Sequence, residues 1–306
     1  FPPPRPGSLA RARAGSPQLS LPDLIPYPEP RSTAMPVSAK DVQALRQATG
    51  LGMMECKKAL EETDGDMAAA AELVRKKFGA KMAGRSDRES GEGKIAIAHD
   101  DHHTAAAIVK VNTETDFTAN NEAFLEMCGK IAELALTQGP GDVTKDEAME
   151  AELEKLRLTT QENIQFGQGK VLGGPGRKVG DYVHFTGKVG VLVEVTLDDG
   201  AEASDELLRD LCMHVSAVSP SPLGITAEDV PADLVEKERE FAKQEAIDSG
   251  KPENIAEKMV EGKMRKYLDT VALLRQPFVK DDKKQVQDLL PKGVSITSFV
   301  RYQVGG

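Results

Sequence analysis

Tryptophan is absent from this chain of 306 residues, and aromatic side chains are scarce in general, with nine phenylalanines and four tyrosines. Each phenylalanine is therefore a candidate core anchor or a candidate contact with another protein. Cysteine is scarce as well, and Cys56, Cys128 and Cys212 lie far apart in apolar helical contexts. Their odd number and the lack of a CxxC pair argue against a disulfide framework or a zinc site, and we expect no metal centre.

The chain also lacks long apolar runs and an excess of positive charge. No window approaches the run of about 18 apolar residues that a membrane span needs. The net charge is −10, which argues against nucleic-acid binding by bulk electrostatics, because that mode needs a basic footprint. We therefore expect neither a membrane nor a nucleic acid among the partners.

Catalytic signatures are missing too. The sequence contains no GxSxG, no HExxH, and no GxGxxG after a strand, and it offers no clear nucleophile. The glycine-rich stretch at residues 167–180 does not match the GxxxxGK phosphate-loop pattern, and we interpret it as β-turns that link strands. A chain with much architecture and no visible chemistry is expected to be a binding protein and not an enzyme.

Residues 1–36 do not have the pattern of a folded domain, because they contain ten prolines, several arginines and few apolar clusters. We interpret them as a disordered leader, a tag, a linker or sequence upstream of a natural start near Met35. The alternative is an organellar transit segment. We accordingly expect a cytoplasmic protein, or one of an organelle matrix if the leader is a transit segment.

Residues 37–80 are expected to form a small three-helix domain. Ser38 and Asp41 have the spacing of a capping box, and Asp66 can cap the third helix. Residues 81–94 are polar and glycine-rich, which indicates a linker.

The centre of the chain contains a repeat. At an offset of 84 residues, the apolar positions of one strand and of the helix after it fall on matching positions further along. Both units are expected to contain a hairpin, a strand, a loop and an amphipathic helix. We therefore predict an α+β multidomain protein whose core is duplicated, with one subdomain at 95–145 and the other at 146–306.

Residues 231–274 are expected to project from the second subdomain as an antiparallel helical hairpin with its bend at 250–252. Leu234 and Phe241, seven residues apart, are expected to lie on the apolar face of its first arm. Two later segments, 277–279 and 294–304, are predicted to be strands that complete the sheet of the second subdomain.

One loop distinguishes the two repeats. A buried strand at 106–112 leads to Thr115, Asp116, Phe117 and Thr118, whereas the second repeat has Gly200 and Ala201 where the first has Asp116 and Phe117. The fold therefore does not require an aromatic side chain at this place. The difference favours a functional role for Phe117, namely insertion into another protein.

Six motifs, in order, resemble those of the translation elongation factor Ts family, the guanine nucleotide exchange factors of elongation factor Tu. The resemblance extends from about Val37 to Val304. The motifs are residues 45–60 with 64–66, residues 112–117 leading to Phe124, residues 213–215, residues 250–262, residues 276–278 and residues 299–305.

The resemblance implies a partner and site residues. Residues 37–80 would be a ubiquitin-associated-like domain that docks on the GTP-binding domain of elongation factor Tu in a 1:1 or 2:2 complex. The implied partner-binding residues are Leu51, Met53, Met54, Lys57 and His214.

In the same family, the turn with Thr115, Asp116, Phe117 and Thr118 would displace magnesium and promote GDP release, with no cofactor and no covalent chemistry of its own. The family commonly has valine where this chain has Thr118. Since the chain stops at Gly306, the resemblance also leads us to expect a missing or reduced C-terminal contact module.

A second functional class, that of an adaptor protein, also agrees with the sequence at this point. A ubiquitin-associated-type domain could instead bind a ubiquitin-like partner, with the remaining residues as a scaffold that has no exchange activity.

Overall fold

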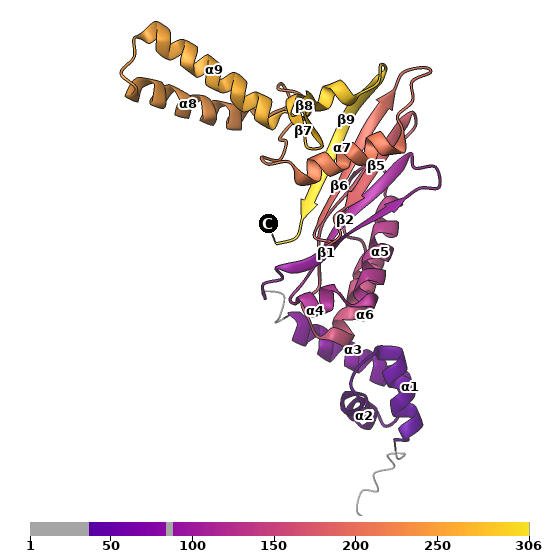
Figure 1. Ribbon diagram of the computed structural model, residues 1–306. Coiled ribbons are helices and arrows are strands. Elements are labelled where there is room, and N and C mark those ends of the chain that lie inside the picture. The colour runs from indigo at the N-terminus through magenta and orange to yellow at the C-terminus, as the bar shows by residue number, and fades with distance from the viewer. Residues whose placement is uncertain (1–36, 84–87, 306) are drawn as a thin grey trace, which may run out of the picture.

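The computed structural model describes residues 37–83 and 88–305; the leader expected at 1–36 lies outside these residues. The described part is elongated, with a small helical module at one end, sheets in the middle and a helical hairpin that projects from the other end (Figure 1). Helices and antiparallel sheets are combined, as expected for an α+β fold.

The N-terminal module contains three helices: α1 (Ala39–Thr49), α2 (Met53–Glu62) and α3 (Met67–Ala83). Ser38 Oγ accepts a hydrogen bond from the Asp41 N–H at 3.1 Å, so Ser38 caps α1. The Asp41 carboxylate accepts from the Ser38 hydroxyl at 2.6 Å and not from the Ser38 N–H, so only one half of the predicted capping box forms. The Asp66 carboxylate accepts from the first turn of α3, as predicted. Helix α3 continues to Ala83, and the next strand begins at Glu92. Residues 81–83 belong to α3 and residues 92–94 to β1, so regular structure extends into the segment 81–94 that we expected to be a linker, while residues 84–87 lie outside the described residues.

The first core unit is a sheet with the strand order β1-β2-β4-β3, all antiparallel. Helix α5 packs on β1 and β2, and α6 packs on α5. The short helix α4 follows β2. The bounds are β1 (Glu92–His99), β2 (Ala105–Thr113), α4 (Asp116–Ala119), α5 (Glu122–Leu136), β3 (Gly141–Asp142), α6 (Glu147–Thr160) and β4 (Gln165–Gly173).

The second core unit repeats this arrangement around β6. Its sheet has the order β5-β6-β9, and α7 packs on β5 and β6. The bounds are β5 (Arg177–Val183), β6 (Val189–Leu197), α7 (Asp205–Ala217) and β9 (Val294–Gln303). Strands β2 and β6 begin and end at the same offset of 84 residues that relates the two sequences. The predicted repeat is therefore confirmed at the level of its elements.

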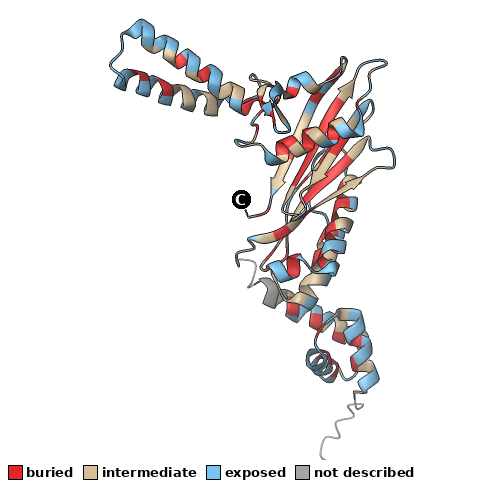
Figure 2. Cartoon of the chain, in the orientation of Figure 1, coloured by how far each residue is buried: buried red, intermediate tan, exposed pale blue. Residues whose placement is uncertain are grey.

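The two sheets face each other, and the helices α5 and α7 cover their outer faces (Figures 1 and 2). Ile95 and Ile108 from the first sheet pack with Leu192 and Val300 from the second. The sheets lie so close that a Cβ atom on Gly190 would be 2.4 Å from Ile95 Cγ2. Any larger residue at position 190 would push the two units apart.

The glycine-rich stretch at 167–180 is not a phosphate loop. It forms most of β4, a turn, and the first residues of β5, and no helix follows the turn. We predicted that the whole stretch consists of turns between strands, but only its middle forms a turn.

None of the helices within residues 37–83 and 88–305 combines the length and the apolar character that a membrane crossing needs.

Helices α8 (Ala232–Asp248) and α9 (Glu253–Val271) form the projecting hairpin. The seam between them is made by Ala242, Ala246, Val260 and Met264. Phe241, which we expected on this seam, is 61% exposed; that prediction was wrong, because the small neighbour Ala242 occupies the seam and lets the two helices approach closely.

The chain returns to the core after the hairpin. The elements are η1 (Leu273–Arg275), β7 (Pro277–Phe278), β8 (Asp281–Gln285) and η2 (Val286–Leu289), and then β9. Strand β9 pairs with β6, as predicted, but β7 pairs only with β8. The prediction that residues 277–279 extend the second sheet was therefore wrong.

Candidate functional site

Phe117 is exposed on a turn of defined structure. It is the second residue of α4, and 86% of its surface is accessible. Thr115 caps this helix, because its Oγ1 accepts a hydrogen bond from the Thr118 N–H at 3.3 Å. Helix α4 lies at the end of the sheets nearest the N-terminal module (Figure 1). The aromatic ring is thus not a core anchor of its own unit, which agrees with the absence of an aromatic from the second repeat.

A single carboxylate, that of Glu162, holds the segment around Phe117. Glu162 Oε2 accepts hydrogen bonds from Thr113 Oγ1 at 2.7 Å and from the Thr115 N–H at 3.1 Å. Glu162 Oε1 accepts from Thr115 Oγ1 at 2.6 Å and from Thr118 Oγ1 at 2.7 Å. The four donors surround Phe117 in sequence, while the phenylalanine itself remains exposed.

The same contacts explain the charge state of Glu162. Partial burial by itself would raise the pKa of this carboxyl, but the hydrogen bonds from Thr115, Thr118 and Thr113 outweigh it and hold the pKa below the ordinary value. Donors that approach a carboxylate favour its ionised form. Glu162 therefore stays an acceptor at neutral pH.

A second tie lies beside the first. The Asn163 N–H donates to Glu114 Oε1 at 2.7 Å, and Asn163 Nδ2 donates to the Arg88 carbonyl at 2.9 Å. Residues 162 and 163 thus hold residues 113–118 as a continuation of the pairing between β2 and β4. Sequence reasoning missed Glu162, because it lies more than 40 positions away from its donors and no periodic pattern links them.

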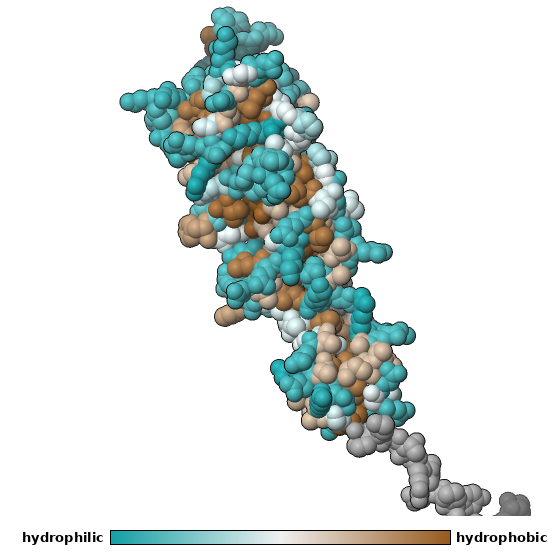
Figure 3. Space-filling view, turned by 90° about the vertical axis from the view of Figure 1, so that its right-hand side faces the viewer, coloured by the Kyte–Doolittle hydropathy of each residue, from teal (hydrophilic) through white to brown (hydrophobic). Residues whose placement is uncertain are grey.

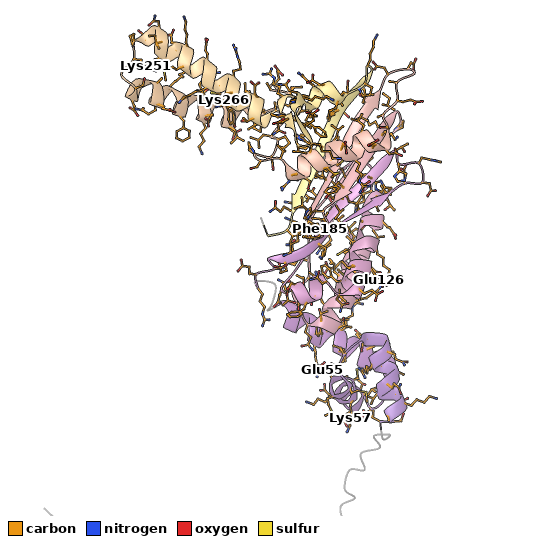
Figure 4. The ribbon with its side chains drawn as sticks, viewed as in Figure 1. Glu55, Lys57, Glu126, Phe185, Lys251 and Lys266 are labelled. Carbon is orange, nitrogen blue, oxygen red and sulfur yellow. The ribbon has the colours of Figure 1, made fainter. Side chains whose placement is uncertain are left out.

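Two methionines of the N-terminal module are exposed. Met53 is 48% and Met54 is 65% accessible, and Lys57 is exposed next to them on α2 (Figure 4). Leu51 is buried in the core of the module. Of the four residues that the resemblance implied here, three can therefore contact a partner directly, and Leu51 can act only by supporting them.

The module is docked on the core. The guanidinium of Arg75 forms two hydrogen bonds, of 3.2 and 3.0 Å, with the carboxylate of Glu154 on α6, and Leu158 of α6 packs against the apolar core of the module. Helix α6 therefore connects the exposed methionines to the segment that begins at Glu162.

His214 lies elsewhere and is fully buried in the second unit. Its Nδ1 accepts a hydrogen bond from the Val279 N–H at 3.3 Å, and its Nε2 lies 3.1 Å from Gln276 Oε1. The ring thus joins α7 to the segment after the hairpin. This burial corrects the expectation that His214 binds a partner by direct contact, because no part of its side chain reaches the surface.

The neutral state of His214 predicts a pH dependence of stability. Burial lowers its pKa below the ordinary 6.5, although the hydrogen bond with Gln276 acts in the opposite direction. The unfolded chain therefore takes up the proton at a higher pH than the folded chain. The stability that neutral His214 confers is complete above the unfolded-state pKa and is lost as the pH falls through the folded-state pKa, where protonation would set Nδ1–H against the Val279 N–H.

Urea unfolding at about pH 7.5 and about pH 5.5 checks this, and we expect His214 to account for a loss on the order of 1 kcal/mol between them. The variant His214→Gln should lack that increment, whereas His102→Gln, at an exposed position, should keep it. An equal pH dependence in all three proteins would contradict the assignment.

Phe185 is a second exposed aromatic that sequence reasoning did not single out. It is 91% accessible on the turn between β5 and β6, and its ring lies 4.3 Å from that of His184 (Figure 4). Phe185 therefore resembles Phe117 in exposure and type but lacks the carboxylate brace.

On the face shown in Figure 3, hydrophobic residues form separate patches among hydrophilic ones.

The cysteine and acidic side chains of the described residues are not gathered into a metal-binding cluster. Across residues 37–83 and 88–305, no group of three or more histidine, cysteine, aspartate or glutamate side chains is arranged to hold a metal ion. All three cysteines are free and buried. Burial raises the pKa of the Cys128 thiol to about 12 and also raises that of Cys212, so that both thiols stay protonated and unreactive at neutral pH.

The comparison with known proteins covers most of the chain. A family model described as elongation factor TS matches residues 114–306. Elongation factor Ts of Prosthecochloris aestuarii is 40% identical over 287 residues, which cover 88% of this chain and 99% of that protein. The proteins of the same description from Halorhodospira halophila and Teredinibacter turnerae are each 42% identical and cover 89% of this chain; the chain covers 93% and 92% of their lengths.

Proposed function

The chain belongs to the elongation factor Ts family and so has a role in translation elongation, and from this membership we propose that it is the guanine nucleotide exchange factor of an elongation factor Tu. The observation that carries the proposal is Phe117, an 86% exposed aromatic on a turn that four hydrogen bonds hold in place. Exposed aromatic side chains on rigid supports are typical anchors of protein interfaces.

In the proposed mechanism, Phe117 enters elongation factor Tu next to its nucleotide site. Burying a phenylalanine side chain contributes about 1.5–3 kcal/mol, which can stabilise a displaced position of the elements that surround the magnesium ion. Magnesium requires nearly ideal octahedral geometry, so a small displacement weakens its contacts with the protein and the GDP phosphates. GDP is then released faster.

The proposal includes reciprocity. If this chain weakens the binding of GDP to elongation factor Tu, then GDP weakens the binding of this chain by the same factor. The binding of a nucleotide to elongation factor Tu therefore releases the exchange factor, and at cellular concentrations this nucleotide is GTP. The chain changes no covalent bond in this cycle.

The ubiquitin-associated-like module, in this proposal, contributes affinity. Met53, Met54 and Lys57 would dock on the GTP-binding domain, while Phe117 acts next to the nucleotide site. The methionines lie on α2 and Phe117 lies on α4, and these helices belong to different parts of the molecule (Figure 1). This separation supports a division between binding and exchange.

The proposal is tested by whether this chain and elongation factor Tu form a complex that nucleotide can dissociate. The full chain is mixed with elongation factor Tu from which nucleotide has been removed, and the complex is isolated by size-exclusion chromatography with light scattering, which also distinguishes 1:1 from 2:2. We expect a complex that dissociates when magnesium and GDP are added. A complex that is indifferent to GDP, or binding to ubiquitin with none to elongation factor Tu, would overturn the proposal in favour of an adaptor.

A further inference from the structure

We propose that Glu162 is a positioning residue for nucleotide exchange: its carboxylate fixes α4 in the orientation that presents Phe117 to the partner. This inference rests on the proposed function of Phe117. Because the Phe117 ring is exposed, its own contacts cannot set its direction. The hydrogen bonds of the residues around it must do so, and Glu162 receives four of them.

The four donors fix α4 at both of its ends. Thr113 is the last residue of β2, Thr115 is the cap of α4, and Thr118 is the third residue of the helix. Since Phe117 lies between Thr115 and Thr118, a rotation of α4 would have to break contacts with Glu162 on one side or the other. The buried Thr118 hydroxyl thus acts as part of the same device.

The chemistry requires a carboxylate. Two oxygens that only accept can take up to four hydrogen bonds, and this number is reached here. A glutamine has the same size but offers one accepting oxygen and one donating amino group. The amide oxygen of Glu162→Gln can still accept from the Thr115 N–H, but its amino group then faces two threonine hydroxyls that must turn to accept. The substitution also removes the negative charge that strengthens all four hydrogen bonds, so we expect α4 to be less firmly held.

Glu162 is itself positioned by rigid elements. It follows the end of α6, where Gln161 adopts the left-handed conformation with φ of +57°. Asn163, its other neighbour, is tied to Glu114. A group that orients another side chain must have its own position fixed, and the end of α6 on one side and β4 on the other satisfy this condition.

The experiment measures the release of fluorescent GDP from elongation factor Tu at increasing concentrations of the full chain. This separates the maximal rate from the concentration that gives half of it. For Glu162→Gln we expect the maximal rate to fall about tenfold, with little change in the half-maximal concentration, because the methionine surface is intact. A purely structural role would instead lower the melting temperature and leave the maximal rate of the folded protein unchanged.

A double-mutant cycle with Phe117→Ala makes the test specific. If Glu162 acts only through Phe117, the substitution Glu162→Gln has no further effect on the maximal rate once Phe117 is alanine, and the two effects are strongly non-additive. Effects that multiply would overturn the inference. If the unsubstituted chain does not accelerate release, the proposed function fails. If Phe117→Ala alone leaves the maximal rate unchanged, the proposed role of Phe117 fails; if Phe117→Ala slows release and Glu162→Gln does not, only the positioning role fails.

Two further variants guard against loss of folding. Thr118→Val removes one donor without changing the size of the side chain, and we expect a graded fall of about threefold in the maximal rate. Glu194→Gln alters a more deeply buried carboxylate of the second unit, which also accepts several hydrogen bonds: it accepts from the Gly173 N–H and from Thr297 Oγ1, both at 2.7 Å, and pairs with Arg177. It should lower stability and leave the maximal rate intact; an equal fall in both glutamine variants would contradict a specific role for Glu162.

Discussion

Replacing Phe117 by alanine should slow the GDP release that the chain promotes by about 10- to 100-fold at saturating concentration. The factor follows from the loss of about 1.5–3 kcal/mol when a buried phenylalanine contact is removed from the displaced state of the partner. Folding should be unaffected, because the side chain is 86% exposed and contributes little to the core. The measurement is the maximal release rate together with the melting temperature.

Phe185→Ala is the matched control for this variant. It removes the same side chain from a turn at an even more exposed position, 91% accessible, but from the second repeat and without a carboxylate brace. We expect a maximal rate equal to that of the unsubstituted chain. If both alanine variants slow release equally, general loss of exposed aromatic surface is the cause, and Phe117 has no special role.

Replacing Met53 and Met54 together by serine should weaken the complex by at least about tenfold, because burying even one methionine side chain at an interface contributes about 1.5–3 kcal/mol. The maximal release rate should stay the same once the concentration is raised to compensate. The expected result is therefore a shift of the half-maximal concentration alone, which is the opposite of the result expected for Phe117→Ala.

Ile247→Ser provides the control for the methionine variant. It also removes exposed apolar surface, from a residue 69% accessible on the projecting hairpin, where the proposed function assigns no contact. Its half-maximal concentration should be unchanged. Undiminished affinity of the methionine variant would show that the N-terminal module does not dock through α2.

Much of the fold was predictable because it depends on local patterns. Capping residues such as Ser38 and Asp66 act within three positions of their partners, and the apolar spacing of strands and helices repeats at one offset along the chain. The exposure of Phe117 was predictable for a related reason, since comparison of the two repeats separates what the fold needs from what one unit has in addition.

The errors have physical causes that a linear pattern does not contain. Phe241 has helical spacing from Leu234, but the seam of the hairpin selects Ala242 because small side chains allow close packing. His214 lies in one of the motifs on which the family resemblance rests, yet both nitrogens of its ring have hydrogen-bond partners inside the protein, the Val279 N–H and the Gln276 side chain. Sequence cannot decide whether such a motif residue is at the surface or supports it.

The role of Glu162 becomes visible only in the three-dimensional structure. Its donors come from a strand end and a helical turn that are distant in sequence, and the contact forms because β4 returns beside β2. The same contact gives Thr118 a structural role, because its hydroxyl completes the set of donors to the carboxylate.

The central claim is that this chain accelerates nucleotide release from elongation factor Tu. The most direct measurement is the release of fluorescent GDP from elongation factor Tu with a substoichiometric amount of the chain and excess unlabelled nucleotide. We predict that each molecule of the chain releases GDP from many molecules of elongation factor Tu, at a rate proportional to its concentration. Release at the spontaneous rate, with the chain present and folded, would contradict the account.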